Sequence, residues 1–79
     1  MSLDETARAI LDFEAEHLAH SAAKEDAIRE SLKLEPARYY QLLGRLIDSA
    51  EALAYAPQLI GRLRRLRDKS SSRRANLLR

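Results

Sequence analysis

The chain of 79 residues contains no cysteine, no tryptophan, two glycines and two prolines. Without cysteine there is no disulfide framework and no thiolate metal site, which fits a reducing cytoplasm. So few turn residues exclude a loop-rich or all-β fold. No apolar run approaches the roughly 20 residues that span a bilayer. Asp4 and Glu5 stand where a signal peptide would be basic. These absences predict a small, cytoplasmic, all-α protein that does not enter a membrane.

The residues that are present favour helices. Hydrophobic residues make up 46% and charged residues 33% of the chain, and alanine, leucine, glutamate and arginine are all good helix formers. Charge is divided unevenly, because residues 1–36 carry nine acidic and four basic side chains while residues 37–79 carry three and ten. Such asymmetry often accompanies an anionic partner for the basic half. A solvated face with a basic flexible tail would give the same composition.

Apolar spacings of three and four residues predict four to five short helices. The expected helices cover residues 4 to 17 or 19, 22–33, 36–47, 51–55 and 58–69. Asp4, Ser21 and either Asp48 or Ser49 are suitable N-caps. Pro36 opens the third helix, where its missing N–H would have been unpaired anyway.

The same periodicity predicts which residues form the core and where the domain ends. Asp12, Glu14 and Glu16 fall outside the first apolar stripe, so we expect them in solvent. After Lys69 the run SSSRR has no hydrophobic period, which predicts a helical domain of residues 1–69 and a flexible basic tail of residues 70–79. The expected core residues are Ala7, Ile10, Leu11, Phe13, Leu18, Ala23, Ala27, Ile28, Leu32, Tyr39, Leu42, Leu43, Leu46, Ile47, Leu59, Ile60, Leu63 and Leu66.

The middle of the chain fits a central helix-turn-helix, in which two helices are joined by a turn of three or four residues. Such a unit needs an apolar residue near the end of its first helix, and Leu32 serves. It needs an apolar residue in the turn, and Leu34 serves. It also needs buried residues one turn into the second helix and three positions later, where Tyr39 and Leu42 stand. Four requirements are met in one window.

Two positions depart from that pattern. Glycine usually stands between the two apolar residues of the turn, because the chain there often adopts positive φ, but this chain has Lys33. A small residue usually faces the second helix four positions earlier, but this chain has Arg29, after Ala27 and Ile28. Either the helices cross differently or the turn is a variant.

The second helix of this unit carries a candidate DNA-binding face. If Tyr39 points inward, Tyr40 is rotated about 100° away and faces outward. Arginine pairs with guanine and glutamine with adenine in the major groove, and tyrosine or arginine can hydrogen-bond phosphate. The alternative is a helical bundle whose face contacts only water or protein. The predicted DNA-binding residues are Ala37, Arg38, Tyr40, Gln41, Arg45, Arg62 and Arg65.

The sequence also resembles a family of small, uncharacterised actinobacterial proteins with a helix-turn-helix-like domain of unknown function. That resemblance implies a cytoplasmic bacterial protein with this fold and implies no known activity. Relatives are expected to have serine or threonine near Glu35, so glutamate implies a weaker cap here and counts against close phosphate approach at that point. The helix-turn-helix is also similar to the promoter-reading part of sigma factors. The segments that carry the family resemblance are ILDFE (10–14), KEDAIRE (24–30), ARYYQLL (37–43), LID (46–48), EALA (51–54) and RLRRLR (62–67).

Other kinds of site have less support. His17 and His20 stand three residues apart, but no third ligand accompanies them, so we expect surface histidines and no metal. There is no glycine-rich phosphate loop and no nucleophile with an evident histidine base, so we expect no catalytic residues, no enzyme and no cofactor. The run RLRRLR has too few leucines to serve both a membrane surface and the core.

The sequence therefore predicts a DNA-binding helix-turn-helix protein in transcription regulation or nucleoid organisation, with double-stranded DNA as partner. The alternative is a protein-interaction module that docks on the transcription machinery through the acidic first helix. DNA binding would weaken steeply with salt, whereas a protein-only module would leave duplex DNA unshifted. The oligomeric state is left open, and a homodimer is one option.

Overall fold

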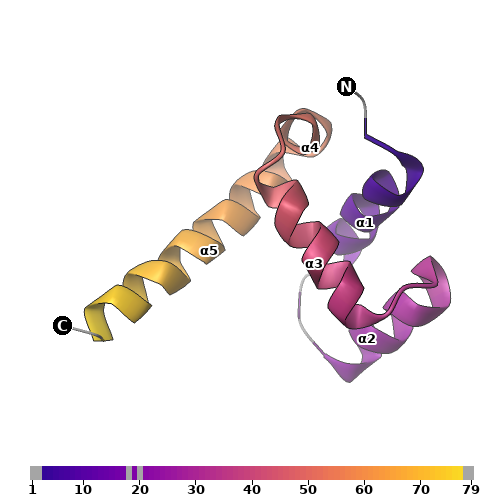
Figure 1. Cartoon of the computed structure of the whole chain (residues 1–79), viewed down its shortest axis with the longest axis horizontal. Coiled ribbons are helices and arrows are strands. Elements are labelled where there is room, and N and C mark those ends of the chain that lie inside the picture. Colours follow the sequence, from indigo (N-terminus) through magenta and orange to yellow (C-terminus); the bar gives the residue numbers. More distant parts are fainter. Residues whose placement is uncertain (1–2, 18, 20, 78–79) are drawn as a thin grey trace.

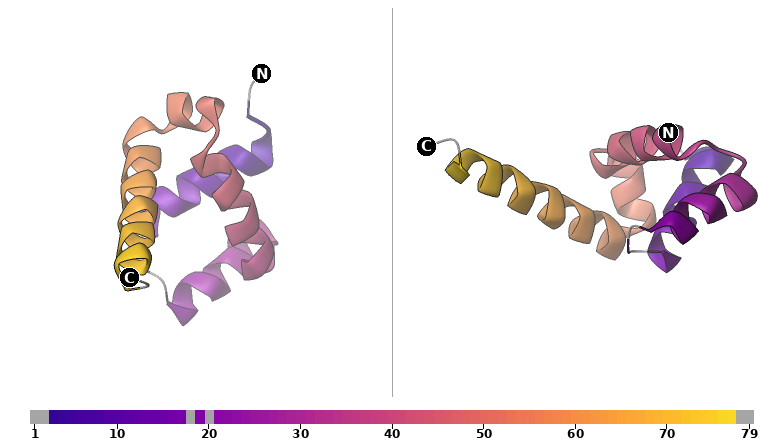
Figure 2. Two further views of the ribbon diagram at one scale, coloured as in Figure 1. Left: turned by 60° about the vertical axis from the view of Figure 1, so that its left-hand side comes forward. Right: turned by 90° about the horizontal axis from the view of Figure 1, so that it is seen from below.

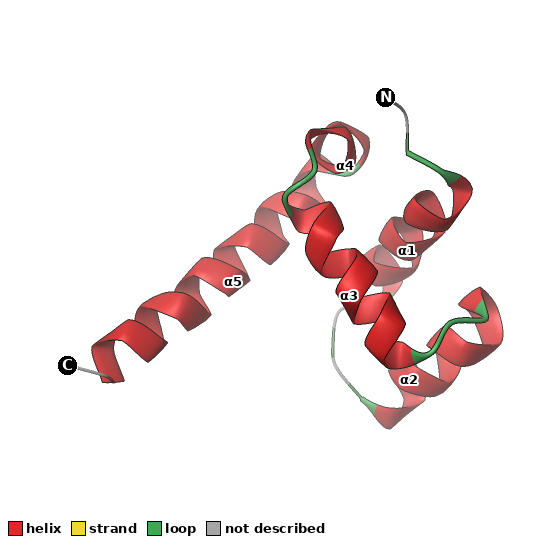
Figure 3. Cartoon of the chain, in the orientation of Figure 1, coloured by secondary structure: helices red, strands yellow, loops and turns green. Residues whose placement is uncertain are grey.

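The computed structural model describes residues 3–17, 19 and 21–77, the last eight through their backbone alone (Figure 1). Within these residues there are helices but no strand, which confirms the predicted all-α fold (Figure 3). The elements are α1 (Glu5–Glu16), α2 (Ala22–Ala27), a π-helical turn η1 (Ile28–Leu32), α3 (Pro36–Ile47), α4 (Ala50–Tyr55) and α5 (Pro57–Leu77).

Helix α3 is the central element of the structure. It packs against α1, η1, α4 and the first part of α5. The later part of α5 leaves the bundle and projects away from the other helices, as Figure 1 and the right-hand view of Figure 2 show. The molecule therefore consists of a packed bundle and a helical arm.

The predicted helix starts are largely confirmed. Asp4, Ser21 and Ser49 each accept a hydrogen bond from the backbone N–H three residues later, as N-caps do. Glu35 precedes α3 without making a side-chain cap, and Pro36 occupies the first helical position. The cap that was expected to be weaker at Glu35 thus makes no side-chain hydrogen bond at all.

Among the described residues the core follows the predicted stripes with two exceptions, and the predicted core residue Leu18 lies outside the described residues. Ala23 is exposed, and Leu66 is 55% exposed. Leu32, Leu34 and Leu42, three of the four helix-turn-helix positions, are partly buried against the core. The buried hydrophobic residues are Ile10, Leu11, Phe13, Ile28, Tyr39, Leu43, Ala52, Leu59 and Ile60.

The π turn η1 explains the two departures from the usual turn pattern. A π turn bonds residues five apart and so inserts one extra residue, which places Ile28 in the core and leaves Arg29 in solvent. Lys33 then adopts the left-handed conformation, with φ 57° and ψ 34°. A residue with a Cβ in that conformation costs about 1–2 kcal/mol. The turn is therefore a variant that keeps positive φ without glycine.

Helix α5 is longer than predicted, because it continues through the SSSRR run to Leu77 instead of ending near Lys69. A helix that projects into solvent needs no apolar stripe, so the loss of hydrophobic period after Lys69 did not mark its end. The division of the chain at residue 69 stays a prediction.

Candidate nucleic-acid interface

One face of α3 is not covered by the bundle. Ala37, Arg38, Gln41 and Arg45 are all exposed, and helical spacing brings residues 37, 41, 44 and 45 to one side. Arg38 Nη1 donates a hydrogen bond of 2.8 Å to Gln41 Oε1, so these two side chains are oriented together. Gly44 lies between Gln41 and Arg45 on this side, and an added Cβ there would meet no atom within 4 Å.

Tyr40 does not lie fully outward as predicted, because it is half-buried. Its ring meets the Tyr39 ring edge to face, with centroids 5.0 Å apart. Lys24 Nζ from α2 lies 5.6 Å from the centroid of the Tyr40 ring, within reach of a cation–π contact. Tyr40 therefore flanks the exposed face and belongs to the contact between α2 and α3.

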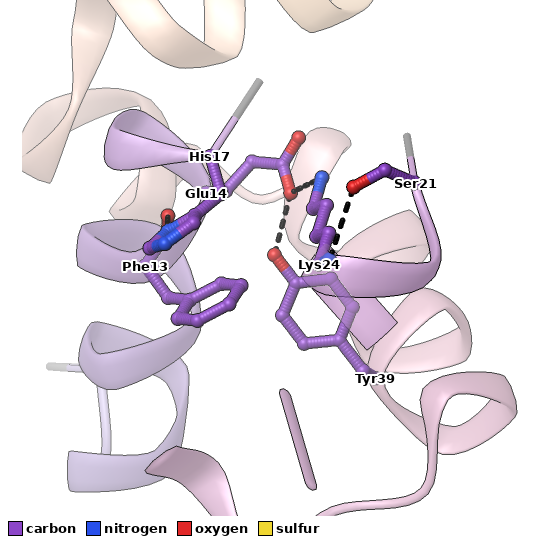
Figure 4. Close-up of polar contacts among 6 residues, drawn as sticks. All are labelled: Phe13, Glu14, His17, Ser21, Lys24 and Tyr39. Carbon is purple, nitrogen blue, oxygen red and sulfur yellow. Dashed lines mark hydrogen bonds and ion pairs between the residues drawn. The ribbon is translucent and has the colours of Figure 1, made fainter. Parts of the chain in front are cut away.

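The opposite side of α3 is held by a polar arrangement inside the core, which we call the buried cluster: Glu14, Lys24 and Tyr39 (Figure 4). Their exposed fractions are 3%, 2% and 0%. Glu14 Oε1 accepts from Lys24 Nζ at 2.8 Å and from the Tyr39 hydroxyl at 2.5 Å. The prediction that Glu14 lies in solvent was therefore wrong.

The sequence carried a signal for the buried cluster. Glu14 stands seven residues after Ala7 and three after Leu11, which is the middle of the apolar stripe at about 100° per residue. Lys24 stands four residues before the buried Ile28, in the same relation to its own helix. Opposite charges on the apolar stripes of two successive helices indicate a buried ion pair, since an unpaired buried charge is too costly.

The surroundings of Tyr39 keep its hydroxyl neutral. Burial raises the pKa of Tyr39 far above its usual value, and the hydrogen bond to the Glu14 carboxylate adds to that effect. A neutral hydroxyl donates to Glu14, whereas a phenolate would repel it. Lys24 Nζ also lies 5.9 Å from the Tyr39 ring centroid, so the cluster joins α1, α2 and α3.

Two arginines of α5 bind the C-terminal end of α3. Arg64 Nε donates to the Ile47 backbone oxygen at 2.7 Å, satisfying one of the last carbonyls of the helix. Arg67 Nη1 lies 2.7 Å from Asp48 Oδ1, and that hydrogen bond raises the pKa of Arg67. Arg64 is therefore partly buried between α5 and α3, unlike the exposed Arg62 and Arg65.

Arg62 and Arg65 are exposed, as predicted, but they belong to another surface. Arg62 stands five residues before Arg67, about 140° around α5, and so points away from α3. It lines a hollow of about 460 Å³ together with Ala15 of α1 and Leu59. The predicted DNA-binding residues thus form two surfaces, one on α3 and one on α5.

His17 makes contacts within α1. Its ring stacks on Phe13 with centroids 4.1 Å apart, and its Nδ1 lies 3.1 Å from the Phe13 backbone oxygen. His20 lies outside the described residues. Among the described residues, no group of three histidine, aspartate or glutamate side chains is placed to hold a metal ion.

The fold is a small all-α domain built around two helices and a three-residue turn. The chain belongs to the family described as "Protein of unknown function (DUF3263)", which matches residues 2–75. Searches of the curated proteins and of the solved structures find no match. Within the part of the chain that the structure describes, no helix is long and apolar enough to cross a membrane. The predicted membership in a family of uncharacterised proteins is confirmed.

Proposed function

We propose that this protein binds double-stranded DNA through α3, acting in the bacterial cytoplasm in transcription regulation or nucleoid organisation. The observation that carries the proposal is the exposed face of α3, where Arg38, Gln41 and Arg45 are uncovered while the opposite side is fixed in the core. A helix is the right width for the major groove, whose base edges carry a distinct donor and acceptor code.

The side chains on this face suit base contacts. Arginine can donate two hydrogen bonds to guanine, and glutamine can pair with adenine, each worth about 1–3 kcal/mol of discrimination. Arg45 is exposed next to Gly44, whose missing side chain leaves space for the DNA. Gln41 Oε1 accepts from Arg38, which leaves the Gln41 amide N–H groups to donate to a base.

The start of α3 and the preceding turn suit phosphate contacts. Lys33 is exposed in the turn, and the first N–H groups of a helix attract anions. Glu35 would oppose a phosphate there, but Arg29 Nε lies 3.6 Å from its carboxylate and offsets part of its charge. On α5, the exposed Arg62 and Arg65 would add affinity that does not depend on sequence.

The proposal is tested by selecting bound fragments from random duplex DNA and measuring affinity by fluorescence anisotropy. Arg45→Ala or Gln41→Ala should lose about 1–3 kcal/mol of preference at one base pair. Arg8→Ala is the matched control, since it removes an exposed positive charge from α1. If wild type binds no duplex at low salt, the proposal fails. If both α3 variants keep the wild-type preference, α3 does not read bases.

The second candidate is a protein-interaction module that docks on the transcription machinery. It is favoured by large exposed apolar side chains, namely Leu53 at 37%, Tyr55 at 46% and Leu66 at 55%, and by the acidic surface of α1. A protein-only module would show no duplex binding and no salt slope, whereas DNA binding loses affinity steeply as salt rises.

A further inference from the structure

The buried cluster is more polar than the stability of a small bundle requires. Glu14 and Lys24 are almost completely removed from water. Desolvating two charges is costly, and apolar residues of similar volume often leave a protein equally or more stable. The best-attested role of such buried ionic groups is to choose one packing arrangement among several. Stability alone therefore does not account for the cluster.

Its geometry suits a role in fixing orientation. Each member comes from a different helix, with Glu14 on α1, Lys24 on α2 and Tyr39 on α3 (Figure 4). Apolar contacts around them, such as those of Leu11 and Leu43, are non-directional. Hydrogen bonds have preferred angles and short distances. The hydrogen bond from Tyr39 to Glu14 is thus the directional contact of this cluster that resists rotation of α3. The Lys24 ion pair holds its acceptor, Glu14, in place.

The neighbouring tyrosines make that resistance necessary. Turning α3 by one residue, about 100°, would exchange Tyr39 for Tyr40, a ring of the same size. Packing volume alone would discriminate weakly between the two rings, although the same turn would put Gly44 in the place of the buried Leu43. In the rotated arrangement, however, the Tyr39 hydroxyl would lose its acceptor. In the observed arrangement, no buried side-chain nitrogen or oxygen among the described residues lacks a partner. Leaving such a group unpaired in the core is costly.

We propose that Glu14, Lys24 and Tyr39 are positioning residues that fix the rotation of α3 and thereby determine which side chains face the base pairs. This inference rests on the proposed DNA binding. Arg38 precedes Tyr39 by one residue and Gln41 follows it by two on the same helix. Any rotation of α3 about its axis therefore moves both side chains together with Tyr39. The cluster should therefore govern sequence discrimination and contribute little to non-specific affinity, because phosphate contacts carry no base identity.

The direct test measures the orientation of α3 without DNA. The chain has no cysteine, so Arg8→Cys on α1 and Gly44→Cys on α3 allow selective spin labelling at two exposed sites. The distance distribution should be narrow in the wild-type background. It should broaden at least about twofold when Glu14→Leu, Lys24→Met and Tyr39→Phe are combined, since the replacement core is non-directional. Ile28→Val is the control, because it loosens the same core without altering the cluster and should keep the narrow distribution.

The second measurement uses unlabelled protein and two duplexes, one selected for binding and one scrambled. In the triple variant the ratio of the two affinities should fall at least about tenfold, equivalent to about 1.4 kcal/mol. Affinity for the scrambled duplex should change less than about twofold. Ile28→Val should keep the wild-type ratio even where its urea midpoint falls further than that of the triple variant.

A narrow distance distribution in the folded triple variant would overturn the proposal, and so would an unchanged affinity ratio in a protein that does discriminate. If the triple variant does not fold, the distance distribution is measured in Tyr39→Phe instead, because this variant removes one hydrogen bond and keeps the ion pair. It should broaden the distribution in part, and no broadening would overturn the proposal. If wild type binds no duplex, the proposed function fails and the distance distributions alone decide the role of the cluster.

Discussion

In the unit formed by α1, α2, η1 and α3, two charged side chains lie in the core at 2–3% exposure. In α5, by contrast, the described basic side chains lie at the surface or at the end of α3. Glu14 and Lys24 are buried because each provides the other with a partner, and Tyr39 completes the set. Acidic residues near α5 are few, and none of those described is buried beside one of its arginines.

This difference in burial predicts how each region responds when a charged side chain is removed. Removing one member of a buried pair leaves an uncompensated charge in the core, which costs several kcal/mol. Removing an exposed charge changes stability little but alters the field that a partner meets. The bundle should therefore govern stability and orientation, and the α5 arm should govern long-range attraction.

The largest effect should come from Tyr39→Ala, which we expect to destabilise the fold by about 3–5 kcal/mol. The ring is fully buried, and its loss also removes a donor from Glu14. Tyr40→Ala should cost clearly less, because Tyr40 is only half-buried. Urea denaturation monitored by circular dichroism measures both. Equal losses for the two variants would mean that the inward register of Tyr39 is wrong.

The next effect is a loss of stability at alkaline pH. The pKa of Tyr39 is raised in the folded state, so the neutral hydroxyl stabilises the fold fully below the unfolded pKa of about 10. This contribution is lost as pH rises above that value, by about 2–3 kcal/mol between pH 9 and 12. Tyr39→Phe should flatten that part of the curve. Tyr55→Phe, which removes an exposed tyrosine, should flatten it less, and equal flattening would contradict the assignment.

A smaller effect separates two neighbouring arginines of α5. Arg64→Ala should cost about 1–2 kcal/mol, because it removes a charged hydrogen bond to the Ile47 carbonyl at a partly buried site. Arg65→Ala should change stability little, since Arg65 is exposed. Thermal unfolding of the two variants measures both losses of stability. A larger loss for Arg65→Ala would mean that α5 docks on α3 through another face.

The smallest effect on stability should follow deletion of residues 70–79. The backbone of residues 70–77 belongs to the part of α5 that projects from the bundle (Figure 1), so the melting temperature should hardly change. The deletion removes three arginines and no acid. Affinity for all duplexes should fall almost equally, and the log–log salt slope should flatten by about 0.9 for each phosphate that is no longer neutralised. An unchanged slope would show that the arm does not touch DNA, and unfolding would show that residues 70–79 support the core.

The sequence by itself determined the helices, their starts and most of the core. Spacings of three and four residues placed Ile10, Ile28 and Leu43 inside, because a helical stripe buries apolar area wherever another helix covers it. Local chemistry was equally sufficient at Ser21 and Ser49, whose caps depend on atoms only three residues away. The candidate face of α3 also followed, because exposure on one side of a helix is fixed by burial of the other.

Only the tertiary structure decided which charges are buried and where helix packing ends. Glu14 and Lys24 are ten residues apart and meet only because α1 and α2 fold against each other. Arg64 and Ile47 are seventeen apart and meet through the crossing of α5 on α3. Leu66 has the spacing of a core residue but is 55% exposed. The spacing of apolar residues is a property of a single helix. Whether a charge is paired or a leucine is covered depends on the side chains of a second helix that packs against it.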